Sequence, residues 1–271
     1  MSTFVTTQAN RSLSDNGRYI EFIESALHSQ RIFSSFKQVP VYKDILEHVT
    51  PELGLEYLRI VATENPTLLL QIEKFRINDL VGSPTIVDYP VVGKISPSTT
   101  RYIKVASDLL LRFGDLSGMR IAEIGVGYGG QLLILDQVCH FINYHIYDLP
   151  PVLELSGKYL ESHILNGSYK KCTLNQADGS VQYDLAISNY AFSELPSHLQ
   201  LKYIEKVLSR STRGYMTMNS GRHDSPYLGN FLTIDQLQSL LPPFTITEEN
   251  PRTAANFILT WDSSSTKANQ L

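Results

Sequence analysis

From Met119 onward, short apolar runs alternate with helical patterns, and this alternation constrains the fold more than any other feature of the chain. We expect strands at 120–124, 143–147, 171–174, 183–188 and 214–218, and helices at 130–139, 152–165, 197–208 and 234–241. Two final runs, 244–247 and 257–261, have no helix between them. The pattern predicts an α/β fold whose mostly parallel sheet carries an antiparallel hairpin at one edge.

The first eighty residues show a different pattern. Apolar residues recur there at helical spacing in four stretches, 19–36, 41–49, 51–63 and 66–80. Gly82, Pro84, Pro90 and Gly93 then interrupt the periodicity around a short extended piece at 85–89, and a further helix starts at Ser96. We therefore expect a helical lid or substrate region at 1–95 and an α/β domain at 96–271.

Composition argues against several classes of function. The chain has 23 Lys and Arg against 27 Asp and Glu, a net charge of −4, so nucleic acid is not an expected partner. The N-terminus is polar and no apolar run approaches the ~18 residues of a membrane span, so no membrane contact is expected. Cys139 and Cys172 lack the spacing of a metal or redox pair, which favours free thiols in a cytoplasmic protein.

A glycine cluster directly follows the expected strand 120–124 and precedes a helix. Within Gly125 to Gly130, backbone without Cβ atoms allows a nucleotide to approach closely at a helix N-terminus. Gly125, Gly127 and Gly130 also satisfy the dinucleotide pattern GxGxxG. The glycines alone therefore leave open a nicotinamide cofactor, S-adenosylmethionine (SAM), or a turn without a ligand.

Glu123 favours one of these alternatives. A carboxylate two residues before the first glycine would repel a pyrophosphate, whereas SAM carries an amino group and a sulfonium and has no phosphate. We therefore expect SAM as the cofactor and S-adenosylhomocysteine (SAH) as its product. The residues of this segment expected to contact it are Glu123, Gly125, Gly127, Tyr128, Gly129 and Gln131.

Polar residues also follow the next strands. Asp148, with Leu149 beside it, is placed to accept both ribose hydroxyls, the alternative being an N-cap for the following helix. Asp178 and Gly179 are placed to meet the adenine amine, or else form a solvated turn. Asn189 closes its strand at the sheet edge where ligands of open α/β sheets lie.

Three segments resemble those of the sugar O-methyltransferases of bacterial natural-product and polysaccharide pathways: 123–131, 147–150 and 188–195. The last, Asn-Tyr-Ala-Phe-Ser-Glu-Leu after Ser188, is far more distinctive than the glycines. The resemblance covers roughly residues 96–262. It implies a class I SAM-dependent methyltransferase fold of the Rossmann-like type, with sheet order 3-2-1-4-5-7-6, and methylation of a sugar hydroxyl.

An alkyl hydroxyl is a poor nucleophile, so its methylation calls for a general base. His223 is the first candidate because it follows the strand 214–218 and titrates in the useful range; Glu194 is the second and Asp224 the third. Contacts to the acceptor are expected from Tyr102, Tyr190 and Arg222, although Tyr102 fits the core as well. No HxxxH or paired-Asp ligand set is present, so no metal is expected.

Alternatives remain open at this point. The GxGxxG pattern also suits an NAD(P)-dependent oxidoreductase, and a degenerate SAM-fold protein would bind a partner without catalysis. Among methyltransferases, a small phenolic or polyketide acceptor competes with a sugar. Because helical appendages commonly supply dimer surfaces, we expect a homodimer.

Overall fold

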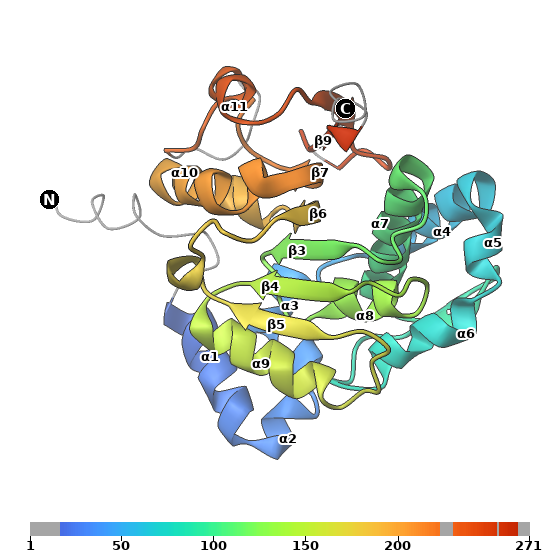
Figure 1. Cartoon of the computed structure of the whole chain (residues 1–271). Coiled ribbons are helices and arrows are strands. Elements are labelled where there is room, and N and C mark those ends of the chain that lie inside the picture. Colours follow the sequence, from blue (N-terminus) through green and yellow to red (C-terminus); the bar gives the residue numbers. More distant parts are fainter. Residues whose placement is uncertain (1–16, 223–229, 254, 265–271) are drawn as a thin grey trace, which may run out of the picture.

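The computed structural model describes residues 17–222, 230–253 and 255–264, and its centre is a seven-stranded sheet (Figure 1). The strands are β3 (Arg120–Ile124), β4 (Asn143–Tyr147), β5 (Tyr169–Cys172), β6 (Tyr183–Asn189), β7 (Ser211–Met218), β8 (Thr245–Glu248) and β9 (Phe257–Asp262). Their order is β5-β4-β3-β6-β7-β9-β8, with β9 antiparallel to both neighbours and the other pairs parallel. Counted from β3, this confirms the expected order 3-2-1-4-5-7-6 and the antiparallel edge.

Alternation along the strands gives the sheet two apolar faces. Ile121, Tyr144 and Ile146 join one buried cluster with residues of α7 (Pro97–Phe113), α8 (Gly130–Asp136) and α9 (Pro150–Leu160). Ala122, Tyr147 and Met216 join the other with residues of α10 (Ser197–Lys206) and α11 (Ile234–Leu240). Successive residues of a strand point to opposite faces, so central strands such as β3, β4, β6 and β7 contribute to both clusters.

The N-terminal region is helical as expected, but apart from α4 its helices are shorter than expected. They are α1 (Gly17–His28), α2 (Gln30–Phe33), α3 (Pro40–Leu46), α4 (Pro51–Glu64), α5 (Pro66–Leu69) and α6 (Ile72–Phe75), with 3₁₀ turns η2 (Phe36–Gln38) and η3 (Arg76–Asp79). The prediction of continuous helices at 19–36 and 66–80 is wrong, because each stretch is divided into shorter helices and a 3₁₀ turn. Ser29 caps α2 by accepting the Ile32 amide at 3.4 Å, which ends the first helical run.

This region packs directly on the α/β core. Tyr19, Leu58 and Phe75 belong to the same buried cluster as α7, α8 and α9, and α1 contacts α9 (Figure 1). The connection to α7 contains a hairpin of β1 (Val87–Tyr89) and β2 (Gly93–Ile95). No helix in the described part of the chain is long and apolar enough to cross a membrane.

Buried polar groups of η3 fix the start of α7. The Asp79 carboxylate accepts the Ser96 amide at 2.8 Å and the Thr99 hydroxyl at 2.5 Å. The Asn78 amide donates to the Thr99 hydroxyl at 2.7 Å and to the Tyr128 hydroxyl at 3.1 Å. Since Tyr128 lies in the glycine loop, these bonds position the lid, α7 and the loop together.

Candidate cofactor and acceptor site

The loop between β3 and α8 has the backbone that its glycines suggest. Gly125, Gly127 and Gly129 have φ of +80°, +56° and +97°, a region that disfavours residues with a Cβ. A Cβ built on Gly125 would lie 2.0 Å from the Ala191 Cβ, at the end of β6. The loop therefore packs its bare backbone against Ala191, just after the carboxyl end of β6, and a side chain at Gly125 would force the two segments apart.

Asp148 lies beside this loop at the end of β4. Its carboxylate accepts the Gly127 amide at 3.2 Å and the Leu149 amide at 2.8 Å, so it binds the loop and caps its own turn at once. Burial raises its pKa to about 6, while bonds from the amides of Leu149, Gly127 and Val126 act in the opposite sense. A carboxylate held at this edge retains lone pairs that can accept hydroxyl groups.

Glu123 has a different environment. Its side chain is buried and accepts the Tyr144 hydroxyl at 2.9 Å, and Tyr144 belongs to the cluster beneath α7, α8 and α9. Burial raises the pKa of Glu123 to about 8, so the neutral acid dominates at pH 7. Glu123 is therefore uncharged at pH 7 and bonded within the core, so it does not offer the negative charge that was expected to favour a cationic ligand.

The raised pKa of Glu123 predicts a pH-dependent stability. A carboxyl whose pKa rises from 4.5 to about 8 on folding favours the folded state at low pH, and that advantage is lost as pH rises through this window. Glu123→Gln retains the acceptor for Tyr144 without the ionisation. Relative to the unmodified chain, the variant should gain stability between pH 5 and 8, by up to about 1.4 kcal/mol per pH unit, in urea unfolding. If the difference in unfolding free energy between the two proteins stays constant from pH 5 to 8, the pKa of Glu123 is not raised in the folded state.

The turn after β6 is strained and tightly bonded. Tyr190 has φ of +68°, which is uncommon for a residue with a side chain and is typical of functional sites. Its hydroxyl donates to Glu249, which also accepts the Asn256 amide at 3.1 Å. Asn189, just before it, accepts the Thr217 hydroxyl at 3.3 Å. The bonds from two other segments hold this strained turn beside the glycine loop.

Glu194 follows on the same turn. Its carboxylate accepts the Asn219 side-chain amide at 2.8 Å, and Asn219 in turn accepts the Ser193 hydroxyl at 2.7 Å. Burial raises the pKa of Glu194, which brings the carboxyl closer to the range useful for proton transfer at neutral pH. His223 and Asp224, the other candidate bases, lie outside the described residues and stay predictions.

The remaining expected residues have varied surroundings. Tyr102 is buried and packs edge-on against Tyr128 with ring centroids 5.9 Å apart, a core position. Arg222 forms an ion pair with Glu248 at 2.9 Å. Asp178 is exposed and accepts the Ser180 amide at 2.9 Å in a local turn. Each of these three side chains thus has a structural partner within the protein.

Sequence reasoning missed the turn between α3 and α4. Leu46, the last residue of α3, lies 3.1 Å from where a Cβ on Gly127 would be, so the N-terminal region contacts the glycine loop at this point. Glu47 next to it is buried, and in the described structure its Oε1 has no hydrogen-bond partner. The segment 41–49 reads as an ordinary amphipathic helix, and no local signal indicates that its end would meet the loop.

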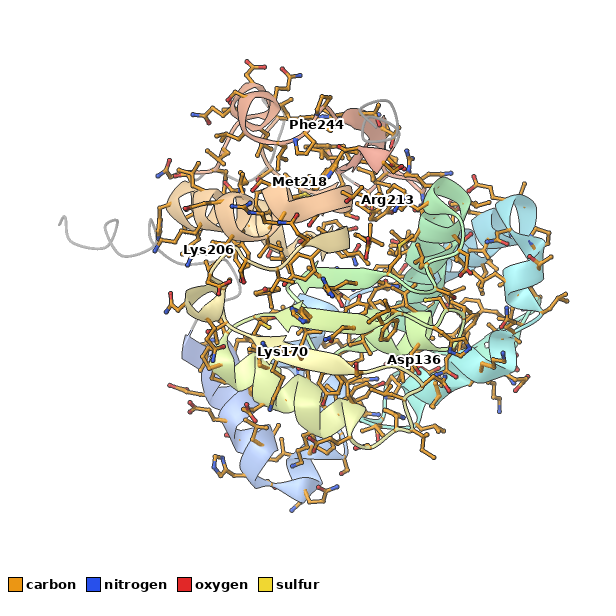
Figure 2. All side chains as sticks on the ribbon, viewed as in Figure 1. Asp136, Lys170, Lys206, Arg213, Met218 and Phe244 are labelled. Atoms are coloured by element: carbon orange, nitrogen blue, oxygen red, sulfur yellow. The ribbon has the colours of Figure 1, made fainter. Side chains whose placement is uncertain are left out.

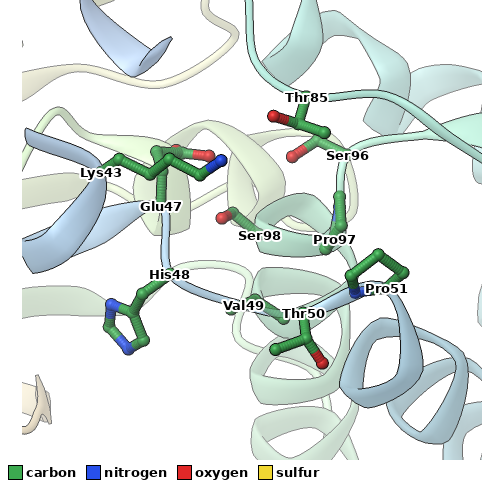
Figure 3. A pocket seen from close by; sticks show the side chains of 10 residues that line it. All are labelled: Lys43, Glu47, His48, Val49, Thr50, Pro51, Thr85, Ser96, Pro97 and Ser98. Carbon is green, nitrogen blue, oxygen red and sulfur yellow. The ribbon is translucent and has the colours of Figure 1, made fainter. Parts of the chain in front are cut away.

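Beside this turn lies a cavity of about 220 Å³. Its lining includes Glu47 and Lys43 on one side and Ser96, Ser98 and Thr85 on the other, with the three hydroxyls turned toward the space (Figure 3). The cavity therefore combines hydroxyl groups with one carboxylate and one ammonium, a set that can donate and accept hydrogen bonds.

A second depression of about 250 Å³ lies over β4 and β5, and its lining includes Tyr147 and Asp178. Two further residues of the lining, Lys170 and Lys206, are labelled in Figure 2. It lies where the chain passes from β5 to β6 through the short turn η4 (Leu174–Gln176) in place of a longer helix. Within the ranges the structure describes, no three His, Cys, Asp or Glu side chains are grouped to hold a metal ion.

The sheet order, with β9 antiparallel between β7 and β8, and the glycine loop after the first core strand define the fold of class I SAM-dependent methyltransferases. The ordinary dinucleotide-binding sheet has the order 3-2-1-4-5-6 without that strand pair. This difference argues against the oxidoreductase alternative.

No protein-family model matches the sequence, and no curated protein matches it significantly. Several solved structures are similar to it at low identity. The magnesium protoporphyrin IX methyltransferase of Synechocystis PCC 6803, with bound SAH, is 14% identical over 75% of this chain and 96% of its own, with a TM-score of 0.43. A 16S rRNA methyltransferase of T. thermophilus, in complex with AdoMet and guanosine, is 16% identical over 66% of this chain and 45% of its own, with a TM-score of 0.45.

An S-adenosylmethionine-dependent methyltransferase from Clostridium acetobutylicum is 11% identical over 52% of this chain and 82% of its own, with a TM-score of 0.41. At these identities the likeness extends to the fold alone. The acceptors named for these proteins differ from one another and belong to those proteins.

Proposed function

We propose that this protein is a SAM-dependent O-methyltransferase. The observation that carries the proposal is the glycine loop, whose Gly127 amide is bonded to Asp148 at the carboxyl edge of the sheet. That edge is where open α/β sheets bind their ligands. A Cβ on Gly125 or Gly127 would meet Ala191 or Leu46, so these glycines let the loop pack closely against its neighbours. The donor set at this edge fits the cofactor, because the Asp148 carboxylate can accept ribose hydroxyls.

We assign the cofactor to the residues around that loop. Asp148 would accept the ribose hydroxyls, and Leu149 would cover the adenine. The other proposed contacts are those of Gly125, Gly127, Tyr128, Gly129, Gln131, Asp178, Gly179 and Asn189. Glu123 is the weakest of the proposed contacts, because its carboxyl is buried and bonded to Tyr144.

When bound, SAM supplies an activated methyl group for an in-line displacement by an oxygen. The chain's part is to hold donor and acceptor at near-attack distance and to exclude water. Leu46, the last residue of α3, already contacts the glycine loop, which supports a role for residues 17–95 in shielding. Glu194, with His223 as the alternative, would take the proton from the acceptor hydroxyl.

For the acceptor we propose a sugar hydroxyl. The support is the sequence resemblance of 188–195 and the hydroxyl-lined cavity beside the lid turn (Figure 3). Of the ten residues that line this cavity, Thr85, Ser96 and Ser98 supply hydroxyls and Val49, Pro51 and Pro97 supply apolar surface. None of the ten is Phe, Tyr or Trp, the rings that a pocket for a phenolic acceptor would favour.

Calorimetric titration with SAH, NAD and NADP tests the cofactor. Micromolar binding of SAH alone supports the proposal, and preferential binding of a nicotinamide nucleotide overturns it. Binding of SAH without methyl transfer to any monosaccharide, glycoside or phenol offered with SAM would favour the non-catalytic alternative.

The two candidate bases make a separate prediction. Glu194→Gln preserves the bond with Asn219 but cannot accept a proton, so turnover should fall by roughly 10²- to 10⁴-fold with little change in SAH affinity. His223→Ala, measured in the same methyl-transfer assay, is the matched comparison. If only the histidine variant loses turnover, Glu194 is not the base.

A further inference from the structure

We propose that Arg101 binds a carboxylate of a ligand at the carboxyl edge of the sheet. The inference deepens the proposed function, because it names a chemical group that the same site must recognise. Two sources fit this chemistry: the methionine carboxylate of the cofactor and a carboxylate on an acidic acceptor.

Arg101 is a buried cation surrounded by aromatic rings. Its side chain projects from the early part of α7, and only 9% of the residue is exposed. The guanidinium carbon lies 5.5 Å from the centre of the Tyr102 ring and 5.9 Å from that of Tyr190. Rings at this distance attract a cation but do not neutralise it.

Among the residues that the structure describes, none forms an ion pair with the guanidinium of Arg101. Glu249 is engaged with Tyr190, Thr253 and Asn256. Glu47 acts on the site electrostatically from beyond ion-pair distance. A buried charge without a partner is costly, and a ligand carboxylate would offset that cost.

The histidine and the tyrosines beside Arg101 add no charge to the site at pH 7. Burial and the field of Arg101 lower the pKa of His48 to about 4, so that imidazole is neutral at pH 7. Burial raises the pKa values of Tyr57 and Tyr190, which stay protonated. Of these four side chains, only that of Arg101 is therefore charged at pH 7.

The location agrees with a ligand at the glycine loop. The Tyr102 ring packs on Gly130, while Tyr190 precedes Ala191, whose Cβ abuts Gly125. Arg101 therefore lies between the loop and the end of β6, the two elements that would enclose the amino-acid part of the cofactor. A guanidinium presents paired donors that match a carboxylate.

The test compares Arg101→Met with Arg112→Met, an exposed arginine on the same helix whose guanidinium donates to Thr260 at 3.1 Å. Affinities for SAH and for decarboxylated SAH are measured by calorimetry. We expect Arg101→Met to weaken SAH roughly 10- to 150-fold and to leave the decarboxylated analogue within about 2-fold. Arg101→Lys keeps the positive charge but not the paired donors of the guanidinium, so it should weaken SAH less than Arg101→Met does. It takes the place of Arg101→Met in the test if that variant fails to fold.

The outcomes separate the two sources. Selective loss of SAH affinity assigns the carboxylate to the cofactor. Unchanged SAH affinity with loss of glucuronate binding to the SAH-loaded protein assigns it to the acceptor. If Arg101→Met weakens binding of SAH and of decarboxylated SAH equally, the inference is overturned. It is also overturned if the affinities for SAH, decarboxylated SAH and glucuronate are all unchanged. If the unmodified protein binds no SAH, the proposed function fails, and glucuronate titration of the unloaded protein decides whether Arg101 binds a carboxylate.

Discussion

Asp148→Ala is expected to weaken SAH binding by roughly 10- to 150-fold while the protein stays folded, because a charge-assisted pair of hydrogen bonds is lost. The carboxylate lies at the end of β4 and is bonded to the amides of Gly127 and Leu149. Its removal takes away a ribose acceptor and one restraint on the glycine loop. Calorimetric titration with SAH measures the loss.

Asp184→Ala is the matched control for Asp148. Asp184 also accepts a backbone amide, that of Arg120 at 2.8 Å, but it lies near the amino end of β6, opposite the proposed site. Its removal should leave SAH affinity within about 2-fold, since a carboxylate remote from the ligand affects binding little. Equal losses for the two variants would mean that the Asp148 effect is one of stability, and unchanged affinity in Asp148→Ala would refute its assignment to the ribose.

Gly125→Ala should destabilise the protein by about 2–5 kcal/mol and abolish detectable SAH binding, because two separate costs add. The residue has φ of +80°, which an L side chain rarely adopts. The new Cβ would also lie 2.0 Å from the Ala191 Cβ, so the loop and the turn after β6 must separate. Urea unfolding measures the first effect and calorimetry the second.

Two variants isolate the causes. Gly118 has φ of +78° but no neighbour within 4 Å of a built Cβ, so Gly118→Ala carries the backbone cost alone, about 1–2 kcal/mol. The double variant Gly125→Ala with Ala191→Gly removes the collision and should recover the difference between the two single alanine variants. If Gly125→Ala costs no more than Gly118→Ala, the close packing at the loop is not important.

Much of the α/β half could be predicted because its signals are local. The expected strands at 120–124 and 143–147 coincide with β3 and β4, and the others lie within three residues of their observed bounds. Period-2 apolar runs bounded by Gly, Pro and Asp are short-range patterns, and the missing helix before β9 made the antiparallel edge predictable.

The lid was predicted less well because its helices are decided by contacts. Ser29 interrupts a periodic run by capping a new helix, and the segment 66–80 divides into α5, α6 and η3. Short helices of this kind are marginal in isolation and depend on packing against their neighbours. Their apolar periodicity says that they are buried but not what covers them.

The sequence by itself indicated a mostly parallel sheet with an antiparallel edge, the glycine loop and the placement of Asp148 and Asn189 at one edge, because each follows from local patterns in the chain. The order of the strands was implied by the resemblance to a family and depends on pairing between distant segments. Only the tertiary structure decided the state of the charges. Glu123 is bonded to Tyr144 within the core, whereas Arg101 is buried among tyrosines and forms no ion pair with a described residue. The reason is physical: the charge and the pKa of a side chain depend on burial and on partners distant in sequence, which periodicity and spacing do not record.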